Sequence, residues 1–281
     1  MNFAHAVGFQ LKNMVRRKEF YFAFLVSLCL IFFSTVFELA GIYKTDVLNL
    51  FPAWIYFGFS SYSVTPVSLA FLQIFAIFAL PFLASLAYSD CCFNNYRDGL
   101  YKLLLPKFGR RQYYASCGTA VFLSSFLLIF IPFLLREAVF LIAVPANSTV
   151  LGPNSPLGDS LFRNVHSLDF LALNHPYVFY FLYCLIPGLT GGCIALLSFS
   201  ISLFYHKNRF LVLTLPGILY LACNFLLPML GVPQAAFSSL ILPPRGIRGL
   251  VLTPLLIYWA ILLLGNIICL ECKIHLLEDE L

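Results

Sequence analysis

Charged residues are scarce in this chain, and their scarcity excludes most classes of soluble protein. Only 10% of the 281 residues are Asp, Glu, Lys or Arg, whereas 61% are hydrophobic. The mean hydropathy of +0.90 lies far outside the range of soluble globular domains. Charge-free stretches of the ~20 residues that a bilayer-spanning helix needs recur along the chain. The composition therefore indicates a multi-pass membrane protein.

Motifs for catalysis and energy coupling are also missing. The chain contains no GxSxG or HExxH pattern and no phosphate-binding GxxxxGK[ST] loop, so neither enzyme activity nor ATP hydrolysis is expected of it. Glu38, Asp90, Glu137 and Glu271 fall at the ends of apolar stretches, whereas proton- or sodium-coupled carriers usually place carboxylates at mid-membrane. A solitary carrier is thus disfavoured, and no metal or cofactor is expected on this chain.

The nine cysteines do not form the spacing of a disulfide framework. Most lie in or at the ends of apolar stretches, where a lone cysteine behaves as a small hydrophobic residue. A single Cys269-x-x-Cys272 pair, without a second pair or nearby histidine spacing, is a weak metal or redox signal. We therefore expect free thiols.

Six stretches combine the required length with continuous or helical hydrophobic periodicity, which argues against a transmembrane barrel. The predicted fold is an all-α membrane protein with six transmembrane helices inside a domain at 20–270, followed by a tail at 271–281. The largest loop outside the membrane is predicted at 144–175. The predicted spans are 20–42, 64–89, 112–135, 176–205, 210–230 and 250–270.

The distribution of Lys and Arg predicts the orientation of the spans. Twelve of these residues fall in the N-terminal segment, the second and fourth loops and the tail, whereas five are spread over the other side. Both termini are therefore predicted to be cytoplasmic. The net charge of +5 is explained by this topology, so no nucleic-acid partner is expected.

Residues 1–19 predict an amphipathic helix on the membrane surface. One apolar face would be formed at i, i+4, i+8, i+11 and i+12 by Phe3, Val7, Leu11, Met14 and Val15. Four basic residues near its end could reach anionic lipid headgroups. The alternative is a basic topology signal in which the periodicity arises by chance.

Two further segments have more than one interpretation. Between the last two spans, the uncharged segment 231–244 predicts either a short helix that re-enters the membrane or a plain loop. In the fourth span, Gly188 and Gly192 form a small-xxx-small pair that permits close helix packing. The adjacent Pro187 could instead make this part of the span a hinge.

The most distinctive stretch is the basic loop at 90–111, between the second and third spans. It contains five of the seventeen basic residues. A break at Asp98-Gly99 precedes an apolar run that includes Leu103 and Leu104. Pro106 and an Arg110-Arg111 pair then lead into the third span. This order is more elaborate than a topology signal alone requires, and it predicts a docking surface for another protein.

At these residues the chain resembles the cytoplasmic loop of ABC-2 type permeases, the membrane subunits of ABC exporters. That family shows an acidic-x-Gly-Thr-like start, a Leu-Leu pair, a proline, a basic residue and an aromatic residue before its third span. The match departs in three places: Asp98 directly precedes Gly99, Leu100 replaces the usual threonine, and Pro106 comes early. The resemblance also covers the layout of an amphipathic N-terminal helix and six spans.

The resemblance implies a permease subunit that forms a translocation path and couples to a separate ATPase, which would bind ATP and magnesium. A second permease subunit, identical or related, would complete the transporter in what is expected to be the bacterial cytoplasmic membrane. The coupling contacts are expected at Arg97, Asp98, Gly99, Leu103, Leu104, Pro106, Arg110 and Arg111. The alternative is a non-transporting membrane scaffold or assembly protein whose basic loop binds another partner.

Overall fold

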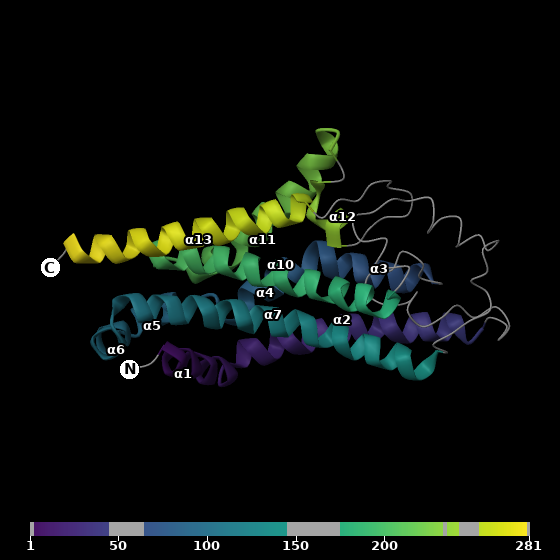
Figure 1. Cartoon of the computed structure of the whole chain (residues 1–281), viewed down its shortest axis with the longest axis horizontal. Coiled ribbons are helices and arrows are strands. Elements are labelled where there is room, and N and C mark those ends of the chain that lie inside the picture. Colours follow the sequence, from purple (N-terminus) through teal and green to yellow (C-terminus); the bar gives the residue numbers. More distant parts are fainter. Residues whose placement is uncertain (1–2, 45–64, 145–174, 233–234, 242–252, 280–281) are drawn as a thin grey trace.

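The computed structural model describes residues 3–44, 65–144, 175–232, 235–241 and 253–279, and within these ranges the chain is almost entirely helical with no strand. Six helical segments are long and apolar enough to cross a membrane, which confirms the predicted all-α architecture. Apart from α11, which slopes away from the others, they run along the long axis of the molecule (Figure 1). The segments are α2 (Lys18–Ile42), the run from α3 to α5 (Pro66–Arg97), α7 (Arg110–Ala143), α10 (Pro176–Phe204), α11 (Arg209–Met229) and α13 (Thr253–Asp279).

The second span is longer and less regular than the sequence suggests. Instead of ending near residue 89, it turns at Ser89 and Asp90 and continues for two further helical turns. Its parts are α3 (Pro66–Ile74), a π-helical turn η3 (Phe75–Ala79), α4 (Leu80–Tyr88) and α5 (Cys91–Arg97).

Pro81 leaves one backbone carbonyl of this span without its usual donor, and a neighbouring helix supplies one. In a π turn the N–H of residue 81 would donate to the carbonyl of residue 76, but proline has no N–H. The hydroxyl of Tyr220, on α11, donates instead to the Ala76 carbonyl oxygen at 2.8 Å. The buried carbonyl is thus satisfied, and α11 is attached to the second span at this point.

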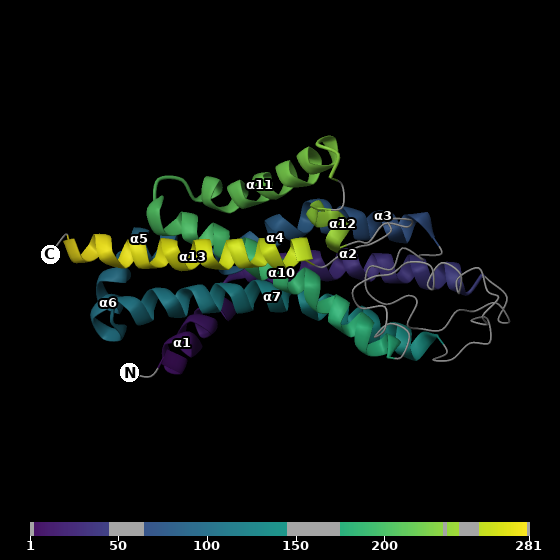
Figure 2. The ribbon, with the colours of Figure 1, turned by 45° about the horizontal axis from the view of Figure 1, so that its top comes forward.

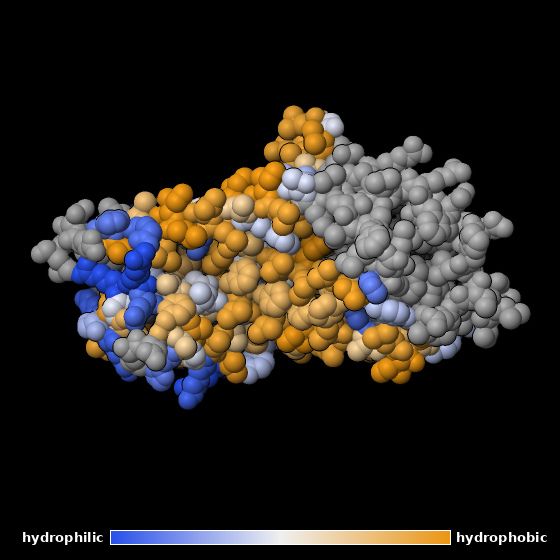
Figure 3. Space-filling view, in the orientation of Figure 1, coloured by the Kyte–Doolittle hydropathy of each residue, from blue (hydrophilic) through white to orange (hydrophobic). Residues whose placement is uncertain are grey.

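α1 (Phe3–Val15), α5, α6 (Tyr101–Phe108) and the carboxyl end of α13 all lie at one end of the bundle, as Figures 1 and 2 show. Hydrophilic surface gathers at this end, whereas hydrophobic surface covers the middle of the molecule (Figure 3). At 34 residues, α7 is about 51 Å long, well beyond a hydrocarbon core of ~30 Å. It can therefore extend past the apolar layer into the hydrophilic end.

A buried cluster holds the elements of this hydrophilic end together. It includes Ala6 and Met14 of α1, Phe108 of α6, Tyr113 of α7 and Phe199 of α10. A larger cluster fills the rest of the bundle between α2, α4, α7 and α10. The short helices α1 and α6 are thus packed onto the spans by the same apolar contacts that hold the spans to one another.

Polar side chains also join the spans. The Ser125 hydroxyl of α7 donates to the Ala84 carbonyl of α4 at 2.7 Å. The Ser89 hydroxyl donates to Ser198 of α10 at 2.9 Å, and Ser198 donates to the Val212 carbonyl of α11 at 2.8 Å. Such interhelical bonds contribute on average ~0.6 kcal/mol each in membrane proteins. They fix the register of helices whose contacts are otherwise apolar.

A short helix, α12 (Phe237–Ile241), lies within the segment between the last two spans. Leu240 is fully buried, and the Ser238 N–H donates to the Asn224 side-chain oxygen at 2.7 Å. The Tyr258 hydroxyl donates to the Ala235 carbonyl at 3.0 Å, which joins this segment to α13. Its re-entry into the membrane remains a prediction. The expected outer loop at 144–175 lies outside the described residues except at its two ends.

Candidate functional site

Two glycines set the path of the chain through the predicted coupling loop. Gly99 has φ +71° and follows the end of α5, and Gly109 has φ +79° between α6 and α7. Neither would meet another atom within 4 Å if it carried a Cβ. The positive φ, which side-chain-bearing residues rarely adopt, is therefore the reason for glycine at both turns. Between them, α6 crosses the end of the bundle.

One face of α6 packs inward. Phe108 is buried, and its ring lies 5.7 Å from the ring of Phe9 on α1. Leu104 and Leu105 are half-buried against the same cluster. The sequence placed Leu104 beside Leu103 on a single docking face, but in the structure Leu104 belongs to the inward face. Burying Phe108 turns the neighbouring leucines of this eight-residue helix toward the bundle.

Three large apolar side chains are exposed at the corner that α5, α6 and the start of α7 form at the end of the bundle. Leu103 is 72% exposed, and Leu100 and Tyr96 are 45% and 49% exposed. We call these three exposed residues of α5, α6 and the turn between them the α5–α6 tip. Large aliphatic side chains are usually buried, so a tip of this kind marks a surface that a partner can cover.

Cations surround the α5–α6 tip. Lys102 and Lys107 are exposed on α6, and Arg111 opens α7 with a side chain that is 78% exposed. Arg111 forms a salt bridge of 2.8 Å with Glu271 of α13. Arg97 pairs with Asp98 at 3.3 Å, with both side chains at least half exposed. Pairs this exposed contribute little to stability, which leaves their charges available to a partner.

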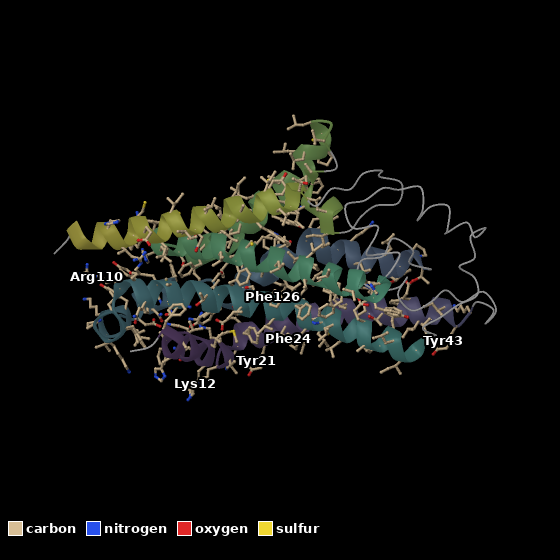
Figure 4. The ribbon with its side chains drawn as sticks, viewed as in Figure 1. Lys12, Tyr21, Phe24, Tyr43, Arg110 and Phe126 are labelled. Atoms are coloured by element: carbon tan, nitrogen blue, oxygen red, sulfur yellow. The ribbon has the colours of Figure 1, made fainter. Side chains whose placement is uncertain are left out.

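The other predicted coupling residues lie around the same corner. Asp98 ends α5, with its backbone N–H bonded to the Asn94 carbonyl at 2.9 Å. Pro106 is exposed on α6, and the half-exposed Arg110 is the first residue of α7. Figure 4 labels Arg110 at this end of the molecule. The structure thus brings all eight predicted residues to one corner, with Leu104 alone turned inward.

The connection between α10 and α11 also reaches this corner. The His206 ring lies 4.1 Å from the Tyr96 ring, and Tyr96 stacks on Tyr101 at 5.0 Å. Burial lowers the pKa of His206, and the Lys273 ammonium lowers it further, so its ring is neutral at neutral pH. A neutral ring packs against the aromatic pair without bringing an additional charge.

An ion network is centred on the buried carboxylate of Asp90, at the start of α5, and the sequence alone does not predict it. Asp90, with a side chain only 1% exposed, accepts hydrogen bonds from Arg17 Nη1 and Arg209 Nε, each at 2.6 Å. Arg17 binds Oδ1 of Asp90, whereas Arg209 binds Oδ2, which also accepts a hydrogen bond of 2.9 Å from the Asn94 side chain. Arg209 donates a second hydrogen bond, of 2.9 Å, to Glu19. Only Asp90 is buried among the four charged side chains, and the two cations balance the two carboxylates.

This network joins three spans at the start of α5. Arg17 precedes α2, Asp90 sits between α4 and α5, and Arg209 is the first residue of α11. Burial lowers the pKa of Arg17, but the Asp90 carboxylate, together with Cys91 and Tyr88, raises it overall. Arg17 also lies over the Tyr88 ring at 4.6 Å, and Tyr88 donates to Gln10 of α1 at 2.8 Å.

α1 packs on the bundle through a narrower face than its large apolar residues suggest. Its buried positions are Ala6, Gln10 and Met14, whereas Phe3 and Val15 of the predicted face are exposed. Ala6 permits a close approach to α7, and the bond from Tyr88 allows Gln10 to be buried. The remaining exposed apolar residues are free to contact lipid.

The glycines of the fourth span lie elsewhere, against α7. A Cβ on Gly192 would lie 2.7 Å from the Phe122 ring, and one on Gly188 would lie 3.0 Å from the Phe126 ring. α10 continues as helix through the buried Pro187. These distances support close helix packing as the role of the glycines, and the hinge stays a prediction.

The described residues at this end combine an exposed apolar tip, a rim of cations and a buried ion network beneath them. An apolar centre within a charged rim is the arrangement found where proteins bind one another. The corner is therefore suited to recognition of a partner protein. No protein-family model, curated protein or solved structure matches this chain.

Proposed function

We propose that this chain is the membrane permease subunit of an ABC exporter, with the α5–α6 tip as its contact to a separate ATPase. The observation that carries the proposal is the 72% exposed Leu103, held between two glycine turns and surrounded by cations. An aliphatic side chain in that position stabilises nothing in the isolated chain. It contributes binding free energy when a partner's cleft buries it.

The attachment of the corner to the spans supports a coupling role. α6 leads directly into α7, and the Asp90 network joins the base of α5 to α2 and α11. A displacement of α6 by an ATPase would therefore act on several spans together. The chain has no phosphate-binding loop of its own, so ATP and magnesium would be bound by the partner.

In this proposal the basic end faces the cytoplasm, with both termini on that side, and the spans cross the bacterial cytoplasmic membrane. Two permease subunits, identical or related, would enclose the translocation path. α13 has an almost continuous exposed apolar surface that includes Ile257, Ile261, Leu264 and Ile268, which suits lipid or a second subunit. The exposed apolar residues of α1 would seat it in the membrane surface beside the ATPase.

Leu103→Asp tests the proposal at its centre. Burying a leucine contributes about 1.5–3 kcal/mol, and burying a carboxylate in its place costs more, so we expect at least a tenfold weaker association with the ATPase. The measurement is co-purification of the chain, in detergent, with the Walker-A ATPase encoded by a neighbouring gene. Cys272→Asp, which adds the same charge at the exposed end of α13, is the matched control.

Retention of the ATPase by a correctly inserted Leu103→Asp variant would exclude α6 as the coupling element. Absence of a neighbouring ATPase gene, together with a different bound protein whose binding needs Leu103, would favour the scaffold interpretation instead. Loss of ATPase binding in the Cys272→Asp control as well would indicate a general effect of charge at this end.

Charge reversal at Arg110 and Arg111 tests the rim. Charges at a rim mainly change association rate and salt dependence, so we expect a smaller loss, about two- to tenfold, that shrinks as salt is raised. Because Arg111→Glu would also repel Glu271, the exchanged pair Arg111→Glu with Glu271→Arg serves as a control that keeps the salt bridge. ATPase association that is the same in all variants at low salt would contradict a role for the rim.

A further inference from the structure

Three buried thiols converge behind the docking corner. Cys91 and Cys92 begin α5, and Cys117 faces them from α7. Their sulfur atoms all lie within 4.8 Å of one another. Cys91 and Cys117 are 0% exposed, and Cys92 is 6% exposed. Lone buried cysteines are ordinary packing residues, but three sulfur atoms from two helices directed at one point have the donor set of a metal site.

We propose that Cys91, Cys92 and Cys117 form a site for a soft, thiophilic metal ion, and that this ion is Cu(I). Three sulfur ligands about 2.3 Å from one ion lie about 4.0 Å apart in a trigonal arrangement. The observed upper limit of 4.8 Å is therefore within a small side-chain adjustment of that geometry.

The number and type of ligands favour Cu(I) over the other common thiolate-bound ions. Structural Zn²⁺ sites are almost always four-coordinate, and iron–sulfur clusters are usually held by four cysteines. Within the described parts of the chain, no other Cys, His, Asp or Glu donor atom joins the group of three. Soft thiolates without oxygen or nitrogen partners select Cu(I).

The surroundings suit such an ion. Tyr88, Tyr113 and Tyr114 belong to the same buried cluster as the three cysteines and exclude water from it. Arg17, which lies over the Tyr88 ring, places a positive charge near Cys91. Each cysteine that ligates the ion as thiolate releases one proton. Cys92, with its 6% exposure, gives the ion its access from the surface.

A bound ion would join α5 to α7 across the turn that contains α6. It would therefore hold in place the two elements that position the α5–α6 tip. Because the ion binds the folded arrangement of the thiols, Cu(I) should raise the unfolding temperature of the chain in proportion to the logarithm of its free concentration. This site stands on the three thiols alone and does not depend on an ATPase partner.

The test is competition for Cu(I) between the full-length chain in detergent and a chromophoric Cu(I) chelator, under anaerobic, reducing conditions. We expect the chain to withdraw one Cu(I), and Cys117→Ser to weaken its affinity at least 100-fold. Cys193→Ser is the matched control, because Cys193 is also buried and free but lies on α10, outside the group. It should leave affinity unchanged.

X-ray absorption at the copper edge of the unaltered chain gives an independent test if Cys117→Ser fails to fold. Three sulfur neighbours, without nitrogen or oxygen, are expected. Nitrogen or oxygen ligands, no withdrawal of Cu(I), preferential binding of Zn²⁺, or equal loss in Cys193→Ser would each overturn the proposal and leave the thiols as packing residues.

Discussion

Replacing Asp90 by alanine is expected to lower the free energy of unfolding by about 3 kcal/mol, because two arginines lose the carboxylate that they share. Breaking a buried ion pair from one side typically costs about 3–5 kcal/mol. The lower value applies because the side chains of Arg17 and Arg209 remain 20% and 34% exposed, so water partly replaces the lost partner. Unfolding followed in detergent by thermal melting or by denaturant provides the measurement.

Asp98→Ala is the control, since Asp98 is half exposed and its single pairing to Arg97 is long, at 3.3 Å. It should change the stability by less than about 0.5 kcal/mol. Asp90→Asn separates charge from shape, because it keeps the size of the side chain but loses the charge. We expect it to be almost as destabilising as alanine. An Asp90→Ala protein as stable as the Asp98→Ala control would show that the network contributes nothing.

The spans could be predicted from the sequence because each contains a long, almost charge-free apolar stretch, and its length identifies such a helix. The continuation of the second span into α5 could not. Asp90 interrupts the apolar run, and a charged residue usually ends a span. Here the charge is neutralised by Arg17 and Arg209, so the helical path continues beyond it.

The partners of Asp90 cannot be predicted from the sequence for a related reason. Arg17 and Arg209 lie 73 and 119 residues away along the chain, and in the sequence both are sufficiently explained by the orientation of the spans. The same arginines that contribute to the orientation signal also neutralise the Asp90 carboxylate across helices. Which pairs form depends on helix packing, and a single sequence does not contain that information.

The inward and outward faces of the short helices were also difficult to predict. An amphipathic face is inferred from its largest apolar residues. On α1 the packed face instead contains Ala6 and Gln10, because a small residue permits close approach and the Tyr88 hydroxyl donates to the amide oxygen of Gln10. On α6, burial of Phe108 separated Leu103 from Leu104. The sequence therefore predicts a basic connection between the second and third spans, but not which of its residues face the bundle.

A larger side chain at the contact between α7 and α10 is also expected to lower the free energy of unfolding strongly, because three phenylalanines of α7 lie along the glycine face of α10. The rings of Phe122, Phe126 and Phe130 stack in sequence, with centroids 6.4 and 5.2 Å apart. Gly192→Val would place its Cβ 2.7 Å from two atoms of the Phe122 ring, which is closer than real Cβ contacts. We expect it to cost about 3 kcal/mol, the upper end for overpacking, in the same unfolding measurement.

Gly265→Val is the matched control for this prediction, since a Cβ at Gly265 of α13 meets nothing within 4 Å and the change should cost less than about 1 kcal/mol. Phe122→Leu should partly rescue Gly192→Val, because a shorter side chain removes the contact. The resulting coupling energy would measure the packing term directly. A hinge at Pro187 predicts a different result. Gly192→Val would then leave unfolding unchanged and alter only ATP-dependent transport, which would contradict close packing as the role of this glycine.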